Sequence, residues 1–534
     1  MNETVMRIIA SLVTSCLLCC STVKLLGAMQ QSGYKNDVFL RWFKRKDNLF
    51  FNRLSVLALC LALATGCVSL CFSFLSRRAA LLISAIPMLV LLLLFWWSDS
   101  KYALKVQSRR TGRFLRLFAA YFCLTACTAY LLTALLALLA AWNGSFLYGL
   151  IAYVPFAIMP ILLPALLLLA NAITAPFENM HNKKFVKQAG QVLDETEMIR
   201  IAVVGSYGKT SVKNILNTLL SVKYSVVATP ESYNTPIGIA KTVLSPEFSG
   251  KEMFIAEMGA RKAGDIAELC ALVKPDYVVF TGVCEQHLQT FGTLENVWRE
   301  KSEALRAVGK KAVCAESLKE YVAKDFADNE KIVFADSASI TDVMLGATKT
   351  AFKVQYKNDT IAVETNILGN SAVENILLAT TLASELGLTA EELEKGMQKL
   401  QPTPHRLQLL EYEGVYILDD GYNANPRGAK EALGALGRFE GRKCVVTPGI
   451  VECGILEESI NGALGKELAE LAPDKLILVG DTLVGAVKAG YISAGGDAER
   501  LTVKDTLAGA QAVLSEWVSA GDAVLFLNDL PDVY

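Results

Sequence analysis

One stretch of the chain combines the residue types that bind phosphate. The β-branched run 201–204 leads into Gly205-Ser206-Tyr207-Gly208-Lys209-Thr210-Ser211, which is followed by apolar residues at helical spacing. Glycines here let backbone N–H groups point at an anion, the helix N-terminus adds its dipole, the lysine reaches outer phosphates and the threonine hydroxyl suits Mg²⁺. The first glycine of a longer phosphate loop would fall at Val203, so this is a compact Gly-x-x-Gly-Lys-Thr variant. The pattern predicts a nucleotide-phosphate site.

Two further polar side chains follow predicted strands of the same region. Glu257 follows the apolar run 253–256, and His287 lies shortly after the run 277–280. Ligands of open parallel sheets collect at the carboxyl ends of the strands, so we expect both side chains near the phosphate loop. A carboxylate there is suited to holding Mg²⁺ against the phosphates.

The elements that must position these residues form an α/β body. From about residue 186, short apolar strands alternate with amphipathic helices, which predicts a doubly wound sheet over 186–405 and a second α/β domain over 406–534. Composition changes sharply at this point, because residues 1–185 carry a net charge of +13 and the remainder −14. The near-zero total charge therefore combines two different bodies.

The first body, residues 1–185, is predicted to be an α-helical transmembrane domain. Basic residues concentrate in the loops 30–53 and 98–116, so the positive-inside rule places these loops in the cytoplasm and the N-terminus outside. Five crossings then put residue 171 onward inside, as a nucleotide-binding body requires. The five apolar runs are 5–29, 54–75, 79–97, 117–142 and 146–170.

Several classes of function are disfavoured by composition. The predicted spans contain no acidic residue or histidine, which argues against an ion-coupled transporter. The cysteines lack metal-ligand spacing, so neither zinc nor disulfides are expected. We also expect no nucleic-acid partner. The basic loops are typical topology determinants, although an anionic lipid phosphate is an alternative role for them.

Four motifs in order resemble the Mur ligase family over roughly residues 195–490, and most closely the branch that adds D-alanyl-D-alanine to a muramyl tripeptide. Arg406 before the last motif supports this branch. The motifs are Gly-x-x-Gly-Lys-Thr-Ser; Glu257-Met-Gly-Ala; His287-Leu with Phe291-Gly292 and then Lys301; and Asp419-Asp420-Gly-Tyr422-Asn423-Ala-Asn425-Pro426.

The resemblance implies an ATP-dependent ligase that makes an acyl phosphate and lets an amine attack it, releasing ADP and phosphate. It implies that Lys209, His287 and Lys301 are catalytic, with Lys301 as a carbamate. Two Mg²⁺ ions would be held by Thr210, Glu257, His287 and Lys301. The nucleotide would be bound by residues 205–211, Asn375, Arg406 and Asp420, and the substrates by Asn234, Tyr422, Asn423 and Asn425.

The chain also departs from the family pattern. Ser371-Ala372 stands where relatives carry His-Asn, and the C-terminal end 528–534 replaces a Lys-Gly-Ser-type block, which leaves the acceptor open as an amino acid or dipeptide. Membrane helices stand where soluble relatives have a UDP-sugar-binding domain. We therefore expect a bacterial cytoplasmic-membrane enzyme whose cell-wall precursor is presented on a lipid. A folylpolyglutamate-type ligase and a non-catalytic scaffold are the alternatives.

Overall fold

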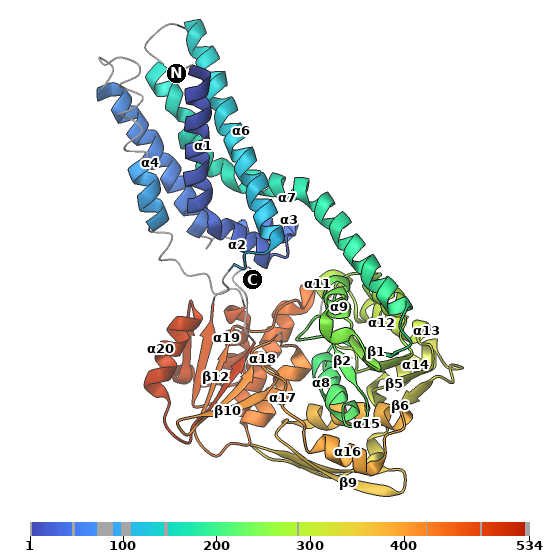
Figure 1. Ribbon diagram of the computed structural model, residues 1–534. Helices are drawn as coiled ribbons and strands as arrows, with labels where there is room; N and C mark the ends of the chain where they lie inside the picture. The colour runs from blue at the N-terminus through green and yellow to red at the C-terminus, as the bar shows by residue number, and fades with distance from the viewer. Residues whose placement is uncertain are drawn as a thin grey trace. The chain divides into compact units, whose positions relative to one another are not determined.

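The computed structural model describes residues 3–44, 49–71, 89–97, 108–143, 148–285, 288–422, 424–480 and 483–528 (Figure 1). The described residues divide into two compact units, one that runs to Lys183 and one that begins at Lys184. Each unit has its own hydrophobic cores.

The N-terminal unit is helical in every described segment that has regular structure. Apolar side chains at helical spacing form its core, which includes Leu25, Phe39 and Leu163. Its helices are α1 (Glu3–Ser21), α2 (Val23–Gln31), α3 (Asn36–Phe43), α4 (Leu49–Cys71), a segment at 89–97, α6 (Gly112–Asn143) and α7 (Tyr148–Asp194), the last of which continues into the second unit.

Among the described residues, two helical stretches are long and apolar enough to cross a membrane, Gly112–Leu135 and Ile158–Asp194. A third arises if Arg7–Ser21 and Val23–Gln31, which meet at a bend of 52°, form one span. The predicted run 54–75 corresponds to α4, of which Arg53–Ala64 qualifies only as a shorter apolar helix. Most of the predicted run 79–97 lies outside the described residues. The five-span arrangement therefore stays a prediction.

The second unit is built on a fully parallel six-stranded sheet with the order β2-β3-β1-β4-β5-β6. Its central strands are buried on both faces, which is why they are continuous apolar runs in the sequence. The strands are β1 (Ile199–Val204), β2 (Val226–Ala228), β3 (Met253–Glu257), β4 (Tyr277–Phe280), β5 (Lys311–Cys314) and β6 (Ile332–Phe334).

Helices cover both faces of this sheet, as the doubly wound prediction requires. One face packs on α8 (Lys209–Leu220), α15 (Asn370–Glu385) and α16 (Ala390–Met397). The other packs on the end of α7 and on four shorter helices. These are α9 (Pro236–Val243), α10 (Asp265–Val273), α12 (Leu294–Lys301) and α13 (Glu303–Ala307).

A three-stranded antiparallel sheet follows, which the sequence analysis did not predict. It consists of β7 (Ile340–Leu345), β8 (Thr350–Tyr356) and β9 (Asp359–Thr365). Alternate residues of β8 and β9 are buried against α15 and α16, so this sheet extends the same core.

The C-terminal part forms a second six-stranded sheet, β10-β11-β15-β12-β13-β14, in which only β10 is antiparallel to its neighbour. From β11 onward its strands alternate with helices, which agrees with the α/β domain predicted for this region. The bounds are β10 (Gln408–Tyr412), β11 (Val415–Asp420), β12 (Lys443–Thr447), β13 (Lys475–Val479), β14 (Leu501–Lys504) and β15 (Ala523–Leu527). The helices are α17 (Pro426–Leu436), α18 (Glu457–Leu471), α19 (Val484–Ser493) and α20 (Leu507–Trp517).

Candidate active site

The loop between β1 and α8 has the geometry of a phosphate cradle. Gly208 has φ 73°, a left-handed conformation that favours glycine, and a Cβ there would lie 2.7 Å from Asn375 Oδ1. A Cβ on Gly205 would lie 2.0 Å from Thr281 Oγ1. Any larger residue at either position would therefore clash with its surroundings. Because both residues are glycines, the backbone N–H groups can lie close to the space that a ligand would use.

The polar groups of this loop are oriented without being fully satisfied. Lys209 Nζ donates to the carbonyl oxygens of Gly205 at 2.8 Å and Ser206 at 3.3 Å. The buried Ser206 hydroxyl has no hydrogen-bond partner among the described residues. Gly208 caps α8 without a side-chain hydrogen bond, so the first N–H groups of the helix receive no acceptor from a capping side chain. This donor set fits a phosphate.

Glu257 ends β3 beside the loop, and its carboxylate is almost completely buried. Lys213 Nζ lies 3.3 Å from Glu257 Oε2, and both side chains are 1% exposed. Asn234 Nδ2 donates to Glu257 Oε1 at 3.1 Å. Burial lowers the pKa of Lys213, and the carboxylate opposes that shift. The sequence analysis missed Lys213, although it lies four residues after Lys209 and so on the same side of α8.

Lys301 is the last residue of α12 and is only 1% exposed. Burial, followed by the positive charge of Lys209, lowers the pKa of the Lys301 amine to about 7. Cys284 lies in the same electrostatic neighbourhood, and burial raises its thiol pKa to about 11. The cysteine is therefore a protonated thiol at neutral pH, whereas a large share of Lys301 is an uncharged amine.

The C-terminal sheet contributes a second group of charges. Arg406 Nη1 donates to the Tyr422 carbonyl oxygen at 2.7 Å, and its guanidinium lies 4.4 Å from the centre of the Tyr422 ring. Burial raises the pKa of Asp420 to about 6, and Arg406 opposes this. On either side of Arg406, His405 (φ 59°) and Leu407 (φ 47°) have left-handed backbones.

These charges lie near the phosphate loop. Burial lowers the pKa of Lys209, and the charge of Arg406 adds to the shift, while Glu257 opposes it. Tyr422 Oη lies 2.7 Å from Ser232 Oγ, two residues before Asn234. The structure thus brings candidate residues of both sheets together, since Arg406 lies near Lys209 and Tyr422 contacts the segment that precedes Asn234.

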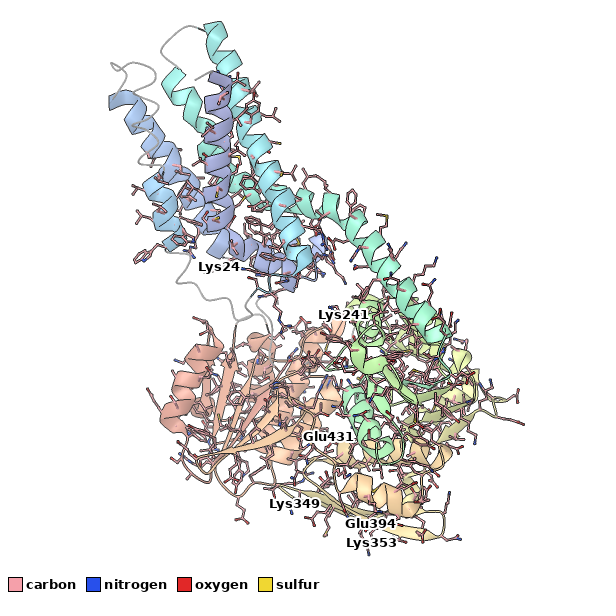
Figure 2. The ribbon with its side chains drawn as sticks, in the orientation of Figure 1. Lys24, Lys241, Lys349, Lys353, Glu394 and Glu431 are labelled. Carbon is pink, nitrogen blue, oxygen red and sulfur yellow. The ribbon has the colours of Figure 1, made fainter. Side chains whose placement is uncertain are left out.

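Two polar contacts between α17 and the N-terminal end of α15 hold the sheets together. Arg427 binds Glu374 at 2.6 Å and donates to the hydroxyl of Tyr207, a residue of the phosphate loop. Glu431, labelled in Figure 2, accepts from the Asn370 N–H at 3.0 Å. Arg427 was not predicted from the sequence, although it follows the Asn-Pro pair of the fourth motif.

The remaining predicted site residues have different placements. Asn425 caps α17, since its Oδ1 accepts from the Gly428 N–H at 3.0 Å. Asn375 is buried beside Gly208, while Thr210 and Ser211 are half-buried in the first turn of α8. His287 and Asn423 lie outside the described residues. Among the residues that were searched, no group of three or more His, Cys, Asp or Glu side chains could hold a metal ion.

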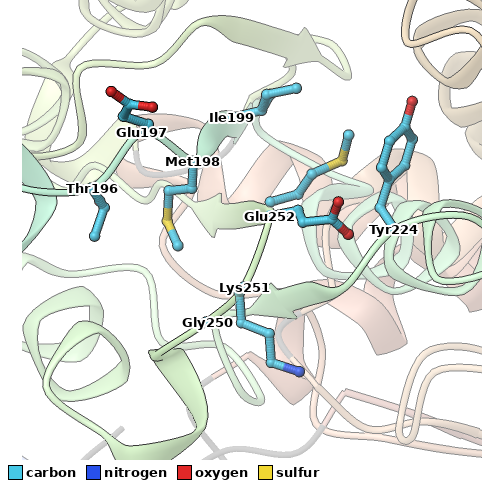
Figure 3. A pocket seen from close by; sticks show the side chains of 9 residues that line it. Thr196, Glu197, Met198, Ile199, Tyr224, Gly250, Lys251 and Glu252 are labelled. Carbon is cyan, nitrogen blue, oxygen red and sulfur yellow. The ribbon is translucent and has the colours of Figure 1, made fainter.

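A cavity of about 470 Å³ lies elsewhere on the second unit (Figure 3). It is lined by Met198, Ile199 and Met253 at the starts of β1 and β3, together with Tyr224 and Glu252. The phosphate loop follows the opposite end of β1. This cavity is therefore separate from the candidate active site.

Comparison with known proteins agrees with this geometry. Residues 203–383 match the Mur ligase middle domain, and residues 405–528 match the Mur ligase glutamate ligase domain. Over these two stretches the chain belongs to the Mur ligase family.

Its curated relatives include UDP-N-acetylmuramoyl-tripeptide–D-alanyl-D-alanine ligases. That of Bacillus subtilis is 30% identical over 284 residues, 52% of this chain and 61% of the relative. That of Borreliella burgdorferi is 28% identical over 306 residues, 55% of this chain and 64% of the relative. The chain thus spans less than two thirds of the length of these relatives.

Solved structures show the same fold. MurF ligase from Thermotoga maritima in complex with ADP has a TM-score of 0.58 and 26% identity, covering 65% of this chain and 80% of that one. MurF from Acinetobacter baumannii has a TM-score of 0.59 and 23% identity, covering 65% and 77%.

Proposed function

We propose that this protein is an ATP-dependent, ADP-forming ligase of cell-wall precursor synthesis that joins a carboxylate to an amine. The observation that carries the proposal is the convergence of the phosphate loop, the buried Glu257 and the Arg406–Asp420 group in one site. The ADP complex of the Thermotoga maritima relative supports nucleotide binding by this fold.

In this proposal the loop N–H groups, the Ser206 hydroxyl and Lys209 hold the phosphates, while Asn375 lies on the base side. Thr210 and Glu257 suit Mg²⁺, which neutralises charge during phosphoryl transfer. Glu257 already has two partners, Lys213 and Asn234, so its carboxylate is oriented beforehand. Arg406 and Asp420 reach the nucleotide from the C-terminal sheet, and the closed arrangement excludes water from the activated carboxylate.

Lys301 has the environment that a carbamate requires. Only an uncharged amine attacks CO₂, forming an N–C bond and releasing a proton, and a pKa of about 7 makes that form abundant at neutral pH. The product carries oxygen atoms that suit a second Mg²⁺ together with His287. This assignment is supported by burial and charge around the amine and by the family resemblance.

For the substrates, we propose addition of D-alanyl-D-alanine to a muramyl tripeptide, as the names of the relatives indicate. Asn234 and Tyr422 are the substrate-side residues, and the contact between Tyr422 and Ser232 supports a substrate site to which both sheets contribute. Asn423 and Asn425 belong to the same motif, and Asn425 acts by shaping the start of α17.

We further propose that the N-terminal unit anchors the ligase in the cytoplasmic membrane of a bacterium, with the N-terminus outside and the ligase inside. The candidate spans and the basic residues of the N-terminal unit support this topology. The proposed ligase acts on a cell-wall precursor. If this precursor is presented on a lipid, that explains why the ligase carries a membrane unit.

The test is turnover by the full-length protein in detergent, with ATP, Mg²⁺, D-alanyl-D-alanine and either a UDP-linked or a lipid-linked muramyl tripeptide. We expect phosphate release that depends on the dipeptide and is faster with the lipid-linked substrate. Turnover of the UDP-linked form alone would refute lipid presentation. Absence of dipeptide-dependent release with both forms, from a folded protein that binds ADP, would refute the ligase and favour a scaffold.

A further inference from the structure

The N-terminal end of α6 collects positive charge. Arg109 and Arg110 precede the helix, and Arg113 and Arg116 lie in its first turns. Among the described residues, Glu178 is the one carboxylate that contacts this group, and it is bound by Arg116 at 2.5 and 3.0 Å.

This placement is electrostatically unfavourable for the protein alone. The N-terminus of a helix carries a partial positive charge, which favours acidic side chains and disfavours basic ones. Arg109, Arg110 and Arg113 form no ion pair within 4.0 Å with any described residue, and of the three the charge of Glu178 acts on Arg113 from a greater distance. Charge that destabilises a fold is typical of a site completed by a ligand.

The backbone of Arg109 and the side chain of Arg113 are held in place by neighbouring residues. Gln30 of α2 forms two hydrogen bonds with the backbone of Arg109, to its oxygen at 2.8 Å and from its N–H at 2.9 Å. The Arg113 guanidinium lies 3.9 Å from the centre of the Tyr34 ring. Asn171 of α7 donates to the Tyr34 carbonyl oxygen at 2.9 Å, which fixes the turn that carries this ring. Topology alone requires positive charge here but not this ordering.

We infer that Arg109, Arg110 and Arg113 bind the phosphate or diphosphate headgroup of a prenyl-type lipid. A guanidinium group can donate two parallel hydrogen bonds to the oxygen atoms of one phosphate, and stacking on an aromatic ring orients these donors. A headgroup at the end of an apolar helix bundle leaves its hydrocarbon chain in the bilayer, whereas a free anion gains nothing from that position. The inference rests on the proposed lipid-linked substrate and names the residues of the N-terminal unit that would hold it.

The probe is geranylgeranyl diphosphate in detergent micelles, with binding to the full-length protein measured by its change in intrinsic fluorescence. We expect Arg113→Ala to weaken binding about tenfold or more, and Arg113→Lys, which keeps the charge but loses the paired donors, to weaken it several-fold. The matched control is Arg41→Ala, because Arg41 is an exposed arginine of the same unit already paired with Asp37. It should change binding less than twofold.

Equal losses for Arg113→Ala and Arg41→Ala would overturn the site in favour of diffuse attraction. Equal binding of the uncharged alcohol geranylgeraniol, or of inorganic pyrophosphate, would overturn the diphosphate-lipid assignment. ADP affinity is measured on the same samples and should be unchanged by Arg113→Ala. If the unsubstituted protein does not bind ADP, the proposed ligase is contradicted instead. Failure of the lipid site and failure of the proposed ligase are therefore distinguishable.

Discussion

Helices α8 and α6 both carry a cationic side chain in the first turn, and they differ in how that charge is satisfied. At the start of α8, Lys209 donates to loop carbonyl oxygens, Gly208 leaves the first N–H groups without a side-chain cap, and nearby charges are buried in pairs. At the start of α6, the Thr111 hydroxyl accepts the Phe114 N–H at 3.2 Å, and exposed arginines carry the positive charge.

The difference indicates two ways of binding an anion. The α8 end offers backbone donors in a cradle too narrow for a Cβ, which suits a phosphate chain held in one orientation. The α6 end offers guanidinium groups rather than backbone donors, because the Thr111 hydroxyl already accepts one of its N–H groups, and this suits a headgroup that arrives from a membrane surface.

The largest effect is expected from Lys209→Ala. In the proposed reaction Lys209 contacts the transferring phosphoryl group, so its removal should lower dipeptide-dependent phosphate release about 10³-fold. Steady-state turnover is the measurement, and Arg41→Ala is the control for a lost exposed charge. Wild-type turnover in the Lys209→Ala protein would show that the α8 end is not the phosphate site.

Lys213→Met tests the buried pair behind the loop. It leaves the Glu257 carboxylate buried with only Asn234 as a partner, so we expect a loss of about 3 kcal/mol in the stability of the second unit. The thermal unfolding midpoint should fall by several degrees. The double variant Lys213→Met with Glu257→Gln should recover most of this loss, because no uncompensated charge remains. A single variant as stable as the wild type would contradict the pairing.

A matched pair of glycine substitutions compares the phosphate loop at Gly208 with the turn at Gly33, which precedes Tyr34. Gly208→Ala must adopt φ 73° and clash with Asn375, whereas Gly33→Ala must adopt φ 63° with no atom within 4 Å of its Cβ. We expect about 2 kcal/mol of destabilisation at position 208 and about 1 kcal/mol at position 33. Only Gly208→Ala should also weaken ADP binding, measured by calorimetry. Equal effects of the two variants on ADP affinity would contradict the cradle.

The smallest effect concerns the pH dependence that Asp420 produces. Its pKa is about 6 in the folded protein, above its ordinary 3.8, so its ionisation costs stability as the pH rises through 6. Asp420→Asn should therefore stabilise the second unit by about 1 kcal/mol at pH 7.5, and by nearly nothing at pH 4, where the native carboxyl is protonated. Unfolding midpoints at the two pH values give the comparison. A gain that is the same at both would exclude a titration effect.

The sequence predicted the parts of the fold that periodicity encodes. Strands β1 to β5 are apolar runs because parallel strands with helices on both faces are buried on both sides. The antiparallel sheet β7–β9 was missed because its alternating pattern is only half apolar and β7 is mostly exposed. Strand β10 was missed for the same reason, as Glu411 and Tyr412 are exposed.

For the site, spacing identified the loop and the strand-end carboxylate, since each follows directly from an apolar run. It did not identify Lys213 or Arg427, because their partners, Glu257 and Glu374, are 44 and 53 residues away in sequence. The motif also did not predict that Asn425 is the N-cap of α17, since an N-cap depends on the local turn rather than on the ligand. Long-range pairing and local capping are decided by tertiary structure.

The backbone on either side of Arg406, in the connection between the two sheets, is strained. Left-handed conformations at His405 and Leu407 each cost about 1 kcal/mol or more, and the contacts of Arg406 with Tyr422 and of Tyr422 with Ser232 must hold them in place. Once those contacts are released, the two residues relax toward ordinary dihedral angles. In the proposed ligase, this strain would lower the free energy needed to break the contacts between the two sheets and release the products.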